Sequence, residues 1–122
     1  MSLYVDFEVD LGGGRKFILS LSKSRALPII NELSRRVPLE TYVFKRGTNV
    51  YIYLGIRKGG VSQVDCSFGK VIYDVVQDCL MICLSDKKIT SRKFIEVGSV
   101  KEGIEVVMTI EERVDAVIRK LG

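Results

Sequence analysis

The chain has 122 residues, of which 47% are apolar and 28% charged, and its net charge is +4. This length suits one domain over residues 1–122, with a core that needs no metal or disulfide. The absence of histidine excludes His-dependent catalytic triads and HExxH zinc sites. No apolar run is long enough for a membrane span, and residues 1–14 lack the features of a signal peptide.

The remaining composition argues for an ordinary solvated surface. Basic and acidic residues alternate along the chain, so nucleic acid is not favoured as a partner, and neither is a membrane. Three cysteines cannot all pair with one another, and we expect reduced thiols in a cytoplasmic protein. The low content of Asn and Gln beside many Lys, Arg and Glu hints at a thermophilic source. We predict no cofactor and no metal, and the sequence is compatible with a homo-oligomer.

Residues 3–10 alternate between apolar and polar side chains, which predicts a half-buried strand. The glycines at 12–14 then form a turn, and residues 16–21 form the return strand of a hairpin. A glycine run before a basic residue also suggests a phosphate-binding loop. Such a loop requires a helix after it, whereas a strand follows here, so we favour the hairpin.

Residues 24–37 are predicted to be a helix, because apolar residues recur at helical spacing at Leu27, Ile30, Leu33 and Val37. Ser24 is the expected N-cap by residue type. Pro28 must then lie in the first turn, and the regular helix begins a residue or two after Ser24. Pro38 ends the helix by restricting the residue before it.

A second hairpin is expected over residues 40–54, with its turn at 47–49. Tyr51 and Tyr53 share one face of the return strand, and apolar residues share the other. Aromatic rings beside Lys45 and Arg46 are also found where proteins stack nucleic-acid bases. We favour pairing of the tyrosines across the strands or at the edge of the core.

The second half of the chain is expected to contain a loop over residues 55–69, with a short strand around Val64. Residues 71–73 and 79–84 are predicted strands, residues 85–93 a polar connection, and residues 94–97 another strand. For residues 111–121 the pattern alone favours a helix over a strand.

Two cysteines lie in the predicted strand 79–84. Cys79 and Cys83 would share a face about 13 Å apart, which is too far for a disulfide between them. We expect buried, reduced thiols and no metal site. Asp78 and Asp86 would lie at opposite ends of this strand, so they do not form an acid–base pair.

From Leu80 to Ile110 the chain resembles the C-terminal part of the cyclophilins. Leu80-Met81-Ile82-Cys83 is similar to the family phrase FFIC, and residues 95–103, IEVGSVKEG, are similar to VVFGKVKEG. The whole chain resembles still more closely the short bacterial and archaeal cyclophilin-like proteins of unassigned function. This resemblance implies a mainly β fold, a closed eight-stranded antiparallel barrel with one main helix and one short helix. It places the short helix at about residues 104–109 and a closing strand at 114–121, against propensity.

The resemblance also locates the positions that serve prolyl isomerisation in cyclophilins. The family arginine maps near Phe44, and Arg46 lies on the required face if the register holds. The pocket aromatic maps to Met81, the glutamine to Cys79, the tryptophan to Ile89 and the histidine to Phe94. Phe44, Arg46, Met81, Ile89 and Phe94 are therefore the candidates for a ligand-binding groove, and filling of a core is the alternative for the apolar ones.

These replacements define three functional hypotheses. The preferred one is a cyclophilin-like binding domain for a peptide or a small apolar ligand, without efficient prolyl isomerase activity. The second is a divergent isomerase that uses Arg46 or Arg57. The third is a weak nucleic-acid-binding protein that uses Lys45, Arg46, Tyr51 and the loop from Lys87 to Lys93.

Overall fold

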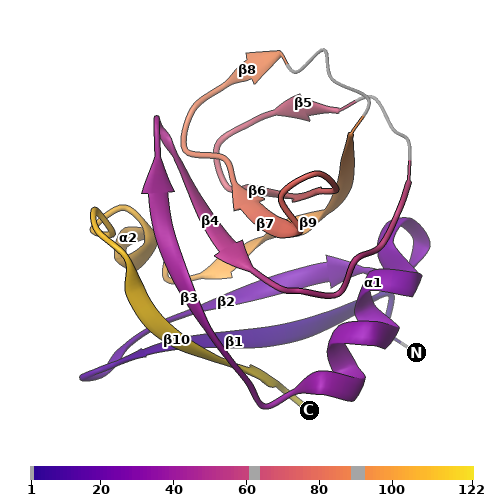
Figure 1. Cartoon of the computed structure of the whole chain (residues 1–122), viewed down its shortest axis with the longest axis horizontal. Coiled ribbons are helices and arrows are strands. Elements are labelled where there is room, and N and C mark those ends of the chain that lie inside the picture. The colour runs from indigo at the N-terminus through magenta and orange to yellow at the C-terminus, as the bar shows by residue number, and fades with distance from the viewer. Residues whose placement is uncertain (1, 61–63, 89–92) are drawn as a thin grey trace.

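The expected closed barrel is confirmed by a computed structural model, which describes residues 2–60, 64–88 and 93–122. Eight antiparallel strands close in the order β1-β10-β3-β4-β7-β6-β9-β2, and β5 and β8 form a separate two-stranded sheet (Figure 1). The barrel strands are β1 (Tyr4–Gly12), β2 (Arg15–Ser22), β3 (Leu39–Arg46), β4 (Asn49–Tyr53), β6 (Lys70–Asp74), β7 (Cys79–Ile82), β9 (Phe94–Glu102) and β10 (Val114–Lys120). The remaining elements are α1 (Lys23–Arg36), α2 (Ile104–Val107), β5 (Asp65–Cys66) and β8 (Lys87–Lys88).

The helix α1 starts earlier than predicted and is interrupted. Its N-cap is Ser22 rather than Ser24, and Ala26 has non-helical dihedral angles of φ −136° and ψ 29°. The interruption restarts the helix just before Pro28, so proline does lie in a first helical turn. The helix ends at Arg36, because Val37 before Pro38 is extended, as predicted. Its buried side chains pack into the barrel core.

The tail is a strand, as the resemblance implied and against the helix that its pattern favoured. β10 pairs with β1 on one side and with β3 on the other. Ala116 and Ile118 face the core, and the N–H of Leu121 continues the pairing by donating to the oxygen of Asp6. Two free strand edges provide backbone partners that a helix cannot use, so tertiary pairing overrides local propensity here.

The strands of one wall have apolar side chains on both faces. Along β4, β6 and β7, alternate residues such as Ile52, Tyr73 and Leu80 belong to the core inside the barrel. The intervening residues contribute to a second apolar cluster on the outside of this wall, together with Val64, Cys66 and Cys83. This cluster is here called the outer cluster: Tyr51, Val64, Cys66, Ile72, Cys79, Met81 and Cys83. The small sheet of β5 and β8, here called the flap, covers this face, because Val64 and Cys66 belong to the cluster.

Gly98 provides a test of the barrel register. It pairs with Leu21 where β9 crosses β2, and a Cβ atom at this position would overlap the carbonyl oxygen of Ser20. We predict that Gly98→Ala lowers the free energy of unfolding by about 2 kcal/mol, because backbone atoms cannot move aside cheaply. Gly59→Ala is the matched control, since a Cβ atom there meets nothing within 4 Å. Equal urea midpoints for the two variants would contradict the register.

Candidate functional site

The outer face of β3 and β4 carries two stacked pairs of aromatic rings, here called the aromatic face. Phe44 lies opposite Tyr51 with ring centroids 5.4 Å apart and an interplanar angle of 11°. Tyr42 stacks on Tyr53 at 5.6 Å and 9°. Pairing across strands, the favoured interpretation of these tyrosines, is therefore what the structure shows.

Two arginines lie against these rings. The guanidinium of Arg46 lies 5.5 Å from the centroid of Phe44 and 5.9 Å from that of Tyr51. Arg46 also donates a hydrogen bond to the side-chain oxygen of Gln77, whose amide nitrogen donates in turn to Asp74 at 2.8 Å. At the other end of the aromatic face, the guanidinium of Arg113 lies 3.9 Å above Tyr42. Arg46 is therefore on the outer face, and its position is fixed by both stacking and hydrogen bonding.

Four of the predicted groove residues lie at a buried cluster: Phe44, Arg46, Met81 and Phe94. Met81 is only 2% exposed within the outer cluster, and Phe44 and Phe94 pack against its margin. Arg46 lies over Phe44, and Ile89 lies outside the described residues. Of the two alternatives, Met81 fills a core, whereas Phe44 and Phe94 are partly buried at its margin.

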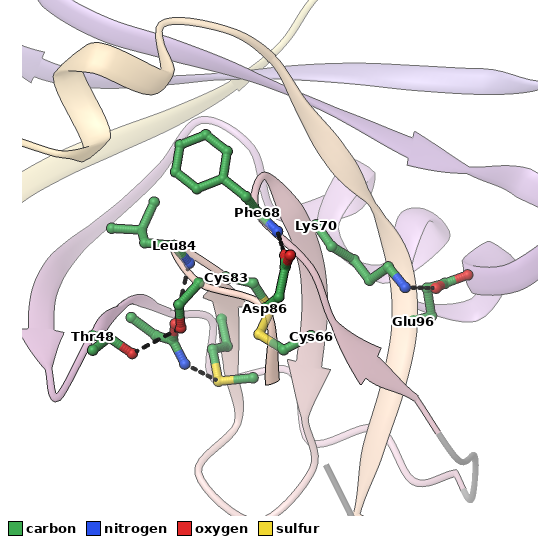
Figure 2. The surroundings of a disulfide bond; sticks show 11 residues. Thr48, Cys66, Phe68, Lys70, Cys83, Leu84, Asp86 and Glu96 are labelled. Atoms are coloured by element: carbon green, nitrogen blue, oxygen red, sulfur yellow. Dashed lines mark hydrogen bonds and ion pairs between the residues drawn. A yellow bond between two sulfur atoms is a disulfide. The ribbon is translucent and has the colours of Figure 1, made fainter. Parts of the chain in front are cut away.

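A disulfide between Cys66 and Cys83 ties the flap to the wall (Figure 2). The prediction of reduced thiols is therefore wrong for these two residues, whose Cα atoms are 5.6 Å apart. Cys79 keeps its thiol, and burial, followed by the charges of Asp74 and Asp78, raises its pKa to about 11. A thiol with this pKa is protonated near neutral pH and is a poor nucleophile.

The flap is also anchored by hydrogen bonds near the disulfide. Asp86 accepts the backbone N–H of Phe68 at 3.0 Å, as Figure 2 shows. The N–H of Gly69 donates to the oxygen of Cys83 at 2.8 Å. Asp86 thus has a role at one end of β7 and Asp78 at the other, which agrees with the expectation that they form no acid–base pair.

An open cleft lies beside the aromatic face, between the β4–β5 connection and the turn that joins β6 to β7. It has a volume of about 550 Å³ and is here called the Tyr53 cleft. Tyr53 and Val76 are well exposed there, at 38% and 72%. Val75, Arg57 and Gln77 also line it, so the glutamine that holds Arg46 belongs to both the cleft and the aromatic face.

The walls of this cleft are held by a network around Asp78. Its carboxylate accepts the N–H groups of Ile56 and Arg57, each at 3.0 Å, and the hydroxyl of Tyr73 at 2.6 Å. The oxygen of Tyr73 accepts the N–H of Lys58 at 3.1 Å. Burial, and then the bond to Asp78, hold the pKa of Tyr73 well above its usual value, so the hydroxyl remains a donor. The network fixes three consecutive residues of the loop, including Arg57 in its left-handed conformation, φ 52°.

Sequence reasoning missed this cleft and the role of Gln77. Tyr53 was placed on the correct face of its strand, but no spacing in the sequence indicates that residues 75–78 lie beside it. Within the described part of the chain, no group of three or more Cys, Asp or Glu is placed to hold a metal ion. The helices of the described residues include none long and apolar enough to cross a membrane.

The comparisons with known proteins define the fold and nothing beyond it. No family model matches the chain, and no curated protein sequence matches it. Among solved structures, the chain is similar to the hypothetical protein AF2241 from Archaeoglobus fulgidus, with a TM-score of 0.79 over 99% of this chain and 98% of that one. The two sequences are 11% identical, so the likeness establishes a shared eight-stranded barrel and carries no activity.

The disulfide leads to a prediction about stability. We expect Cys66→Ala to lower the free energy of unfolding by about 2–4 kcal/mol, because the bond closes a loop across 17 residues of sequence. Cys79→Ala should be destabilised less and should still respond to a dithiol reductant, whereas Cys66→Ala should not. Urea unfolding with and without reductant measures this. A count of three free thiols in the unreduced, denatured wild-type protein would contradict the pairing.

Proposed function

We propose that the chain is a cyclophilin-like binding domain that takes an apolar side chain of a peptide, or a small apolar ligand, into the Tyr53 cleft. The proposal includes little or no prolyl isomerase activity. The observation that carries it is the contrast between two places on the same wall. The position of Met81 is filled, whereas the Tyr53 cleft is open and lined by an aromatic ring and two valines.

The composition of the Tyr53 cleft suits such a ligand. Its volume of about 550 Å³ falls within the usual range for ligand sites. Apolar surface comes from Tyr53, Val75 and Val76, and polar groups come from Arg57, Lys58, Gln77 and Asp78. An apolar side chain would contact Tyr53 and Val76. The guanidinium of Arg57 and the amide of Gln77 are the groups that would contact the peptide carbonyls. Because Asp78 and Tyr73 already hold the loop, ligand binding orders few additional residues.

We expect weak isomerase activity because the guanidinium of Arg46 is already bound to other side chains. Rotation about a prolyl amide must overcome a barrier of about 18–20 kcal/mol. A catalyst lowers the barrier by holding the proline ring in an apolar pocket with a donor close to the amide nitrogen. Here the guanidinium of Arg46 is held by Gln77 over Phe44 and Tyr51, and the family pocket position, Met81, is buried beneath the flap.

The second candidate, a divergent isomerase, is supported by one observation. Arg57 lines the open cleft, so a proline in this cleft would have a guanidinium beside it. The nucleic-acid hypothesis has less support. Tyr51 is 9% exposed and stacked on Phe44, which leaves little ring surface for a base.

Binding in the Tyr53 cleft can be tested with a short, uncharged peptide that contains one leucine. We expect weak binding, with a Kd on the order of 10 mM, because burial of one leucine contributes about 1.5–3 kcal/mol. NMR titration should shift the amides of residues 75–77, and Tyr53→Ala should abolish these shifts. Tyr4→Ala, at an exposed tyrosine of β1, is the matched control and should bind as the wild type does. Shifts confined to other parts of the barrel would sink the proposal.

Isomerase activity requires a separate measurement with a proline-containing tetrapeptide. We expect a turnover at least about a hundredfold below that of a true cyclophilin, the loss typical when a transition-state donor is misplaced. Any residual activity should fall in Arg57→Ala if the second candidate holds, with Arg46→Ala as the comparison. Turnover equal to that of a true cyclophilin would overturn the preferred function.

A further inference from the structure

A second cleft lies on the other side of the β4–β5 connection. It has a volume of about 350 Å³, lies between α1 and β9, and is here called the helix cleft. Its floor is apolar, because Ala26 and Ile29 are buried there beside Pro28. The interruption of α1 at Ala26 places these residues at the start of the second helical segment. Figure 1 shows the chain that leaves β4 passing beside α1, which brings the connection to this cleft.

Lys58 and Gly59 line both clefts, so the two hollows share one wall. The wall is firm on one side, because the N–H of Lys58 is bonded to Tyr73. Its crest at Gly59 carries no side chain. The glycine is not required by packing, since a Cβ atom there would meet nothing within 4 Å, and its φ is not in the left-handed region. A bare crest between two apolar hollows allows an extended backbone to cross from one to the other.

The surroundings of the crest are cationic. Arg57 has no ion-pair partner among the residues that the structure describes. Lys58 pairs with Glu32 at 3.6 Å, but Arg35 and Arg36 hold the same carboxylate at 2.8 and 2.9 Å. At the helix cleft, Glu96 is shared by Arg25 and Lys70, each at 2.7 Å. Glu32 and Glu96 are therefore each shared among several cations. Asp78 also lines the Tyr53 cleft, but its carboxylate is occupied by backbone N–H groups and the hydroxyl of Tyr73. The residues that line the two clefts thus include more cations than carboxylates.

We infer that the two clefts form one site for an extended acidic peptide. One apolar side chain occupies the Tyr53 cleft and another occupies the helix cleft. The backbone between them crosses Gly59, and its acidic side chains face Arg57 and Lys58. The inference rests on the proposed function and adds the partner's chemistry: two apolar residues on the same side of an extended chain, separated by acidic ones.

The test compares three fluorescein-labelled peptides by polarisation. One has two leucines four residues apart with glutamates between them, one has glutamines in place of the glutamates, and one has a single leucine. In an extended chain the two leucines lie on one side, about 13 Å apart. We expect the second leucine to increase affinity about tenfold, and the glutamates to add about threefold more at low salt. The contribution of the glutamates should shrink as salt increases and should be lost in Arg57→Gln.

Gly59→Leu adds a side chain whose Cβ atom meets nothing within 4 Å, and it should reduce the affinity of the two-leucine peptide to that of the single-leucine peptide. Glu105→Leu, at an exposed position of α2, is the control and should change neither affinity. If the single-leucine peptide binds and the second leucine adds nothing, the inference is wrong but the proposed function stands. If the single-leucine peptide fails to bind, the proposed function itself is wrong. Equal or tighter binding of the glutamine peptide at low salt would also overturn the inference, because the partner would then not be acidic.

Discussion

The pairing of β10 with both β1 and β3 is the constraint on which the rest of the structure depends. It removes the last two free edges and seals the core that Phe7, Val43 and Ile118 share inside the barrel. A sealed barrel satisfies its own backbone and buries its inner side chains. The outward-facing side chains of each strand are then not needed to close the barrel. They can differ from one part of the barrel surface to another.

The outward-facing side chains lie in three different environments. On β4, β6 and β7 they form the outer cluster, which the flap covers and the disulfide holds in place. On β3 and β4 they stack as aromatic pairs under Arg46 and Arg113. Beside the β4–β5 connection, apolar surface remains open around Tyr53 and Val76. The ligand site that we propose begins at this part of the wall, which neither packing nor stacking has filled.

The sequence determines the local elements of the fold and leaves the surface pairings open. Alternation gives both hairpins, and helical spacing with Pro28 and Pro38 gives α1 to within a residue or two. The tail was ambiguous because its alternation is short, and only the demand for closure settles it as a strand. The partner of Cys83 could not be predicted, since Cys66 belongs to the two-residue strand β5, within a segment whose sequence has no periodic pattern. The same holds for Gln77 beside Tyr53, which depends on how two distant turns meet.

Asp78 holds the loop that lines the Tyr53 cleft, where we propose that a ligand binds. Ile56 and Arg57 lie beyond the end of β4, where no strand of the described residues provides backbone partners for their N–H groups. The carboxylate of Asp78 accepts these hydrogen bonds instead, and it thereby holds the loop. The bond from the protonated Tyr73 completes this arrangement, and the oxygen of Tyr73 extends it to Lys58. These hydrogen bonds use the backbone N–H groups of Arg57 and Lys58. The two side chains therefore do not take part in holding the loop to Asp78 and Tyr73. In the site that we propose, a ligand would meet a loop whose backbone is already ordered, so little of the binding free energy would be spent on ordering it.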